Sequence, residues 1–126
     1  MKDKLVRDVM AIGVPACRSD TSVVDVARVL AEEARDILIV MGDQGVEGVV
    51  SQSDMARAFL RDYTEMTAGQ IMSAGVCSVS PDLPLAAAVE TMIEKGYHQV
   101  LVADEGGSAT PLGVLSKRHL VELMAE

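Results

Sequence analysis

The chain has 126 residues, of which 49% are hydrophobic but only three are aromatic, and its formal net charge is −8. This length fits one compact domain, whose core must consist of aliphatic residues and methionine. The negative charge would repel a phosphate backbone, and three aromatic residues offer no base-stacking platform, so nucleic-acid binding is not an expected function.

The sequence contains no membrane or secretion signal. No apolar run approaches the ~18 residues that a spanning helix needs, and residues 1–4 lack a secretory apolar region. Cys17 and Cys77 each lie in a short apolar stretch and form no disulfide framework, which favours small buried thiols. We therefore expect a cytoplasmic protein without membrane association.

An internal repeat organises the chain. Residues 9–14 reappear in similar form as residues 71–76, 62 positions later. After three extra residues in the second copy, residues 48–51 match residues 113–116. A unit of about 60 residues present twice predicts two similar halves, related by a pseudo-two-fold axis, that need each other's apolar faces.

In the first copy, residues 20–22 supply N-cap oxygens for a helix over 23–33, whose apolar residues recur at helical spacing. Residues 37–41 contain no polar side chain, which predicts a strand covered on both faces. The remaining elements expected here are a turn at 42–45, a strand over 46–51 and a second helix over 54–61.

The second copy predicts the same order after a polar connector at 61–67. Pro84 fits the first turn of a helix, where its missing N–H costs nothing, and Gly96 is expected to end that helix. The elements that follow are a strand over 100–103, a loop over 104–110, a strand over 111–116 and a helix over 118–124. We therefore predict an α/β fold of two β-α-β-β-α repeats, over 5–61 and 68–124, within one module of residues 1–126.

Residues 48–54 read Gly-Val-Val-Ser-Gln-Ser-Asp and resemble a motif of the cystathionine-β-synthase-type (CBS) domain. That motif has Gly, two apolar residues, Ser or Thr, two variable residues and Asp. The family is also matched by Met10 and Met72, each at the end of an entry turn, by Ser-Pro-Asp at 80–82 and by the run 94–102. The resemblance covers residues 5–123 and implies a tandem CBS pair, with two small sheets packed between helices, which usually forms a flat homodimer.

The resemblance also implies a ligand. Members of the family that bind ligands take adenosine-containing molecules, such as AMP, ADP, ATP or S-adenosylmethionine, between the two repeats. A ribose diol needs a carboxylate, and a phosphate needs helix N-terminal amides, hydroxyls and a cation. The residues implied for one site are Asp54 for the ribose, Ser51 and Ser53 near the phosphate, Val49, Met72 and Cys77 against the adenine, and His98, Gln99 and Arg118 facing the phosphate.

The second, equivalent site is expected to be degenerate. His119 stands where the ribose carboxylate would be, and Asp36 would place a negative charge near any phosphate, at a cost on the order of 1–4 kcal/mol. A reading without any ligand stays open for the first site, because Ser51 to Asp54 also matches a capping box. In that reading His98 is a surface residue and Arg118 a solvated helix residue.

No feature of the sequence predicts catalysis. The chain has no nucleophile-elbow sequence with a histidine, no Cys/His metal spacing and no glycine-rich loop followed by lysine, so we expect no enzymatic activity, no metal and no obligatory cofactor. We expect a regulatory, energy-sensing homodimer that binds an adenine nucleotide and acts on a separate partner protein, since no partner domain is attached. The alternatives are a scaffold for homodimerisation or protein interaction without ligand, and an S-adenosylmethionine sensor.

Overall fold

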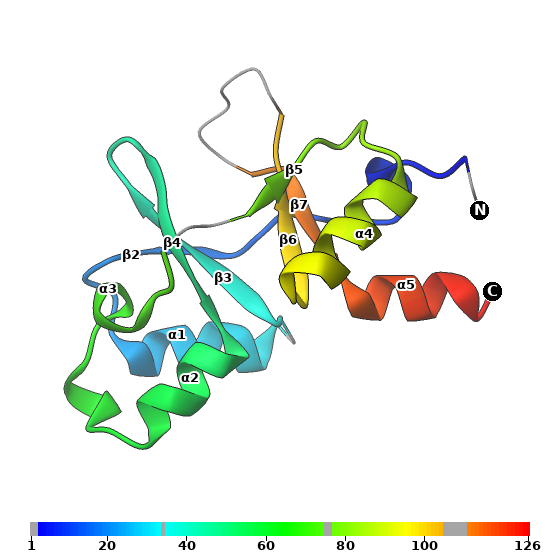
Figure 1. The fold of residues 1–126 in the computed structure, drawn as a ribbon. Helices are drawn as coiled ribbons and strands as arrows, with labels where there is room; N and C mark the ends of the chain where they lie inside the picture. The colour runs from blue at the N-terminus through cyan, green and yellow to red at the C-terminus, as the bar shows by residue number, and fades with distance from the viewer. Residues whose placement is uncertain (1–2, 34, 75–76, 105–110) are drawn as a thin grey trace. The chain divides into compact units, whose positions relative to one another are not determined.

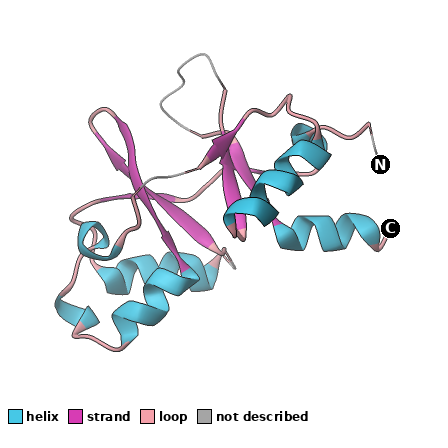
Figure 2. Ribbon diagram, viewed as in Figure 1, coloured by secondary structure: helices cyan, strands magenta, loops and turns pink. Residues whose placement is uncertain are grey.

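The computed structural model describes residues 3–33, 35–74, 77–104 and 111–126. The chain divides into two compact units. We call Val14–Val76 the first unit, and Met1–Gly13 together with Cys77–Glu126 the second unit. Each unit combines a small sheet with helices (Figures 1 and 2). Within the described part of the chain, every helix is too short or too polar to cross a bilayer.

The first unit contains β2 (Ala16–Arg18), α1 (Val23–Glu32), β3 (Ile37–Gly42), β4 (Gly45–Ser51), α2 (Gln52–Phe59), a 3-10 helix (Tyr63–Glu65) and α3 (Ala68–Ile71). Its sheet has the order β2-β3-β4, with β2 parallel and β4 antiparallel to β3. Residues 37–40 of β3 are all buried, which confirms the strand predicted to be covered on both faces.

The second unit contains a 3-10 helix (Val6–Asp8), β1 (Ala11–Ile12), β5 (Ser78–Val79), α4 (Leu85–Lys95), β6 (Gln99–Val102), β7 (Gly113–Ser116) and α5 (Lys117–Met124). Its sheet has the order β1-β7-β6-β5. The strand registers are equivalent in the two units: Ala16 pairs with Ile39 in the first unit, and Ser78 pairs with Leu101 in the second. The predicted α/β fold of two β-α-β-β-α repeats is confirmed.

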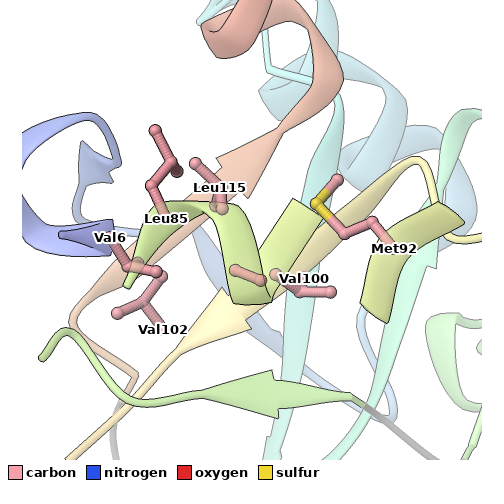
Figure 3. Packing of buried hydrophobic residues seen from close by; sticks show 7 residues of the cluster. Val6, Leu85, Met92, Val100, Val102 and Leu115 are labelled. Carbon is pink, nitrogen blue, oxygen red and sulfur yellow. The ribbon is translucent and has the colours of Figure 1, made fainter. Parts of the chain in front are cut away.

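The segment at the start of each repeat packs in the unit that contains most of the other repeat. We call residues 3–13 and 63–73 the lead-in segments. Val6 and Ala68 occupy equivalent positions in them, and both are 0% exposed within the two cores. Figure 3 shows Val6 near Leu85 and Val102 in the core of the second unit. The Val6 N–H donates to the carbonyl of Leu83 at 2.9 Å, so backbone and side chain both hold the segment.

The helix boundaries follow from local capping. Ser22 caps α1 by accepting from the N–H of Asp25, and Gly96 ends α4 in the left-handed conformation with φ of 70°, as predicted. Pro84 differs from its prediction, because it is the N-cap of α4 with extended ψ rather than a residue of the first turn. Helix α2 begins at Gln52, not at 54, because Ser51 is its N-cap. Most of the predicted 104–110 loop lies outside the described residues.

Candidate functional site

The start of α2 is a capping box built on Ser51 and Asp54. Ser51 is the N-cap and Asp54 is the third helical residue. The Ser51 N–H donates to Asp54 Oδ2 at 2.9 Å, and the Asp54 N–H donates to Ser51 Oγ at 3.3 Å. The Ser51 hydroxyl also donates to Oδ2 at 3.0 Å. The local role that the sequence predicts for this pair is therefore present, whatever else Asp54 does.

The second oxygen of Asp54 has two further donors. Ser73 Oγ donates to Oδ1 at 2.7 Å, and Arg57 Nη2 donates to the same oxygen at 2.5 Å. The Asp54 side chain is 2% exposed, whereas that of Arg57 is 67% exposed. These charge-assisted bonds stabilise a carboxylate that would otherwise be costly to bury. The structure thus presents a buried negative charge at a helix N-terminus.

A short β-bridge carries Ser73 to the carboxylate. Val49 N–H donates to the Ser73 carbonyl at 3.0 Å, and Ser73 N–H donates to the Val49 carbonyl at 2.8 Å. Gly48 makes this approach possible, because a Cβ there would lie 2.8 Å from the Ser73 carbonyl oxygen and 2.9 Å from Met72 Sδ. The half-buried side chains of Val49 and Met72 therefore belong to the same part of the first unit as Asp54.

The second unit repeats this architecture with different side chains. His119 is the third residue of α5, and its Nδ1 accepts from the Ser116 N–H at 3.0 Å, while the His119 N–H donates to Ser116 Oγ at 3.4 Å. Ala11 pairs with Val114 in the register that Ser73 has with Val49. An imidazole and a methyl group thus stand where the first unit has a carboxylate and a hydroxyl.

The comparisons with known proteins identify the family. The family model of the CBS domain matches residues 6–61 and 68–126, which together span nearly the whole chain. The chain belongs to the CBS-domain family. The resemblance inferred from the sequence is thereby confirmed, and the two matched ranges correspond to the two copies of the repeat. Among curated proteins, no sequence is significantly similar to this CBS pair.

Solved structures share the fold of this CBS pair. One is the CBS domain pair of protein MJ0100 in complex with 5'-methylthioadenosine and S-adenosyl-L-methionine, with 20% identity, TM-score 0.85, and coverage of 97% of this chain and 96% of that chain. Another is a CBS domain protein from Pyrobaculum aerophilum complexed with AMP, with 22% identity, TM-score 0.79, and coverage of 98% and 100%. An uncharacterized conserved protein from Pyrococcus horikoshii has 19% identity, TM-score 0.88, and coverage of 100% and 96%.

The candidate residues of the CBS pair divide between the units. Those near the start of α2 in the first unit are Val49, Ser51, the exposed Ser53, Asp54 and Met72. In the second unit, Gln99 pairs with Ser116, the carbonyl of the exposed His98 accepts from Lys117 N–H at 3.1 Å, and Arg118 follows in α5. These three therefore gather near the start of α5.

The other positions singled out from the sequence have local partners of their own. The carbonyl of Cys77 accepts from Leu101 N–H at 3.0 Å at the start of β5, and its side chain is half-buried. Arg118 lies 3.8 Å from Glu122 in an exposed ion pair. Asp36, expected to disfavour phosphate at the degenerate site, accepts from Gln52 Nε2 at 3.2 Å.

Sequence reasoning missed two residues of the Asp54 cluster, Ser73 and Arg57. Arg57 could have been found from its i+3 spacing to Asp54 on a helix. The signal for Ser73 is weaker. When the two copies are compared, Ser73 stands opposite Ala11, just as Asp54 stands opposite His119. Among the described residues, no group of His, Cys, Asp and Glu is placed to hold a metal, and every buried polar side-chain atom has a partner.

Proposed function

We propose that this CBS pair is a regulatory module that binds an adenosine-containing ligand, with Asp54 accepting hydrogen bonds from the ribose diol, and that signals to a partner protein. The observation that carries the proposal is the buried carboxylate at the start of α2, with hydrogen-bond donors on both of its oxygens. The equivalent position in α5 has an imidazole, which cannot accept two hydroxyl groups at once. The expected stoichiometry is one ligand per chain.

The ligands of related structures support the choice of adenosine compounds. The Pyrobaculum aerophilum protein is complexed with AMP, and the MJ0100 pair with 5'-methylthioadenosine and S-adenosyl-L-methionine. The shared part of these ligands is adenine and a ribose diol. In the proposal, the family resemblance assigns Val49, Met72 and Cys77 to the adenine, and Ser51, Ser53, His98, Gln99 and Arg118 to the phosphate.

A titration with AMP, ATP and S-adenosylmethionine tests the proposal. We expect at least one of them to raise the melting temperature, because a ligand at 100 times its Kd adds about 2.7 kcal/mol to the free energy of unfolding. Asp54→Asn keeps an oxygen for the helix cap but removes the charge, so it is expected to abolish the shift. The matched control, His119→Asn, is at the equivalent position of α5 and is expected to leave the shift unchanged. No shift with any of the three ligands at millimolar concentration contradicts the proposal.

The phosphate contacts are tested by the choice of ligand. If His98, Gln99 and Arg118 face a phosphate, AMP binds more tightly than adenosine. Equal affinity for AMP and adenosine, together with tighter binding of S-adenosylmethionine, favours a sensor for a ligand without phosphate. The formal charge of −8 makes that reading reasonable, because the chain as a whole repels anions.

A second candidate function is a homodimerisation or protein-interaction scaffold. Large apolar side chains are exposed at the ends of α2 and α5: Phe59 is 70% exposed, Leu60 85%, Val121 65% and Met124 72%. Phe59 and Met124 occupy equivalent positions in the two repeats. In the proposal these residues contact a second copy of the chain. Sedimentation of Phe59→Glu and Met124→Glu variants, with and without AMP, separates assembly from ligand binding.

A further inference from the structure

We propose that Ser73 is a built-in competitor of the ligand, whose hydroxyl holds on Asp54 the acceptor position that a ribose hydroxyl takes. Ligand binding then requires the Ser73 hydroxyl to turn away from Asp54 Oδ1. The inference rests on the proposed function, in which the ribose diol binds to Asp54. It adds a residue that sets the affinity and the sugar specificity of that site.

The Asp54 carboxylate has a limited capacity to accept hydrogen bonds. A carboxylate offers about four lone-pair positions, two on each oxygen. On Asp54 they receive the Ser51 N–H, the Ser51 hydroxyl, the Ser73 hydroxyl and the Arg57 guanidinium. A diol that donates two hydrogen bonds must therefore displace donors that are already in place.

The four donors differ in how readily they can leave. The two from Ser51 belong to the helix cap, so their loss would destabilise the start of α2. Arg57 is 67% exposed, so its guanidinium can return to water at little cost. Both Arg57 and Ser73 bond to Oδ1, which makes that oxygen the one that a ligand can free.

Ser73 is the donor that resembles the ligand. Its aliphatic hydroxyl donates to Oδ1 at 2.7 Å, the usual length of a bond from a sugar hydroxyl to a carboxylate. Two backbone hydrogen bonds to Val49 hold the Ser73 main chain, so rotation about χ1 alone can remove the hydroxyl. The competition is therefore local and leaves the β-bridge intact.

A consequence for specificity follows. A ribose diol needs two acceptor positions and must displace both donors of Oδ1, Ser73 and Arg57. A sugar with a single hydroxyl needs one position, which the exposed Arg57 can leave. The competitor therefore lowers the affinity for ribose more than the affinity for 2'-deoxy sugars. The second unit has a methyl group at this position, in Ala11, and the imidazole of His119 in place of the carboxylate.

The test measures AMP binding to the full chain and to Ser73→Ala by calorimetry. We expect threefold to tenfold tighter binding by Ser73→Ala, because the ligand no longer competes with an internal hydrogen bond. Without ligand, the variant is expected to melt at a lower temperature than the wild type, and this difference is expected to shrink at saturating AMP. A purely structural role would leave the same difference with and without AMP. The preference for AMP over 2'-deoxy-AMP is expected to rise in Ser73→Ala, because only the diol needs the position that Ser73 occupies in addition to that of Arg57.

Controls separate this inference from the proposed function. Ser73→Cys keeps the side-chain volume but donates weakly, so it is expected to tighten binding if Ser73→Ala does not fold. Ala11→Ser places a hydroxyl at the equivalent position of the second unit and is expected to leave AMP affinity unchanged. If wild type binds AMP but Ser73→Ala and Ser73→Cys bind equally well or more weakly, only the competitor is refuted. If the wild type binds no adenosine compound, the proposed function fails and the competitor with it.

Discussion

Helices α2 and α5 begin with the same geometry and carry different chemistry. In both, a serine at the end of a strand is the N-cap, and the third helical residue accepts a hydrogen bond from the backbone N–H of that serine. That third residue is Asp54 in α2 and His119 in α5. The neighbouring strand supplies a hydroxyl in one unit, from Ser73, and a methyl group in the other, from Ala11.

The comparison shows what the fold requires at this position and what it does not. A ring nitrogen closes the capping box of α5 as a carboxylate oxygen closes that of α2, so the cap requires an acceptor but no charge. Capping alone therefore does not explain a carboxylate that is 2% exposed and has two further donors. In the proposed function, the ribose diol of the ligand is what requires the carboxylate.

The largest expected effect tests whether the β-bridge beside each helix is equally tight. A Cβ at Gly113 would fall well inside contact distance of the Ala11 carbonyl oxygen, so Gly113→Ala must separate β1 from β7. We expect a loss of about 3 kcal/mol in the free energy of unfolding, from strain and a broken strand pair. Gly48→Ala is less crowded and is expected to cost about 1–2 kcal/mol. Urea denaturation of both variants measures the difference, and equal losses would show that the two bridges are equivalent.

The next effect compares the two capping residues directly. Asp54→Ala leaves the Ser51 N–H and the Ser73 hydroxyl without their acceptor, and we expect it to cost about 2 kcal/mol. His119→Ala removes one acceptor from a half-buried position and is expected to cost less than about 1 kcal/mol. Thermal and urea unfolding measure both. A larger loss for His119→Ala would reverse the comparison.

A smaller effect is expected when the chemistry of α2 is copied onto α5. His119→Asp places a negative charge in the first turn of a helix and keeps an acceptor for the Ser116 N–H. We expect a gain of about 0.3–1 kcal/mol from the helix dipole, which salt reduces. His119→Asn is the neutral control. Destabilisation by Asp together with tolerance of Asn would mean that α5 excludes a charge for a reason other than capping.

The smallest expected effect concerns Cys17, whose place in the second unit is taken by Val79. Burial raises the pKa of the Cys17 thiol, the nearby charge of Asp20 raises it further, and a hydrogen bond with Thr21 opposes the shift. A raised pKa leaves less thiolate at pH 8, so alkylation by iodoacetamide is expected to be slower than for a free thiol and to accelerate as the pH rises. Cys17→Val identifies the labelled site in mass spectrometry and is expected to change stability by less than about 0.5 kcal/mol. Alkylation as fast as that of a free thiol would contradict this account.

Most of the fold can be read from local patterns in this sequence. Helical spacing, the glycine stop at Gly96 and the apolar run of β3 each specify one element. The sequence pattern places Pro84 one residue too far into α4, because a proline fits both the N-cap and the first turn. Local patterns do not predict the core in which each lead-in segment is buried, since the apolar side chain of Val6 fits either core.

The candidate site divides in the same way. The capping box of Ser51 and Asp54 is a spacing of three residues, so the sequence is sufficient to predict it. The bond from Ser73 joins residues 19 positions apart and depends on a β-bridge that forms only in the folded unit. Local sequence patterns predict contacts between residues that are close in the chain. Contacts between distant residues, such as Ser73 and Asp54, depend on tertiary pairing.

The burial of Val6 among residues of the second repeat affects whether one repeat can fold without the other. The other buried residues of the core that contains Val6 begin at Leu85. During synthesis, Val6 therefore has no core to pack against until most of the chain has left the ribosome. A fragment encoding residues 5–61 alone would keep that valine in water and lack Ala68, which fills the reciprocal place.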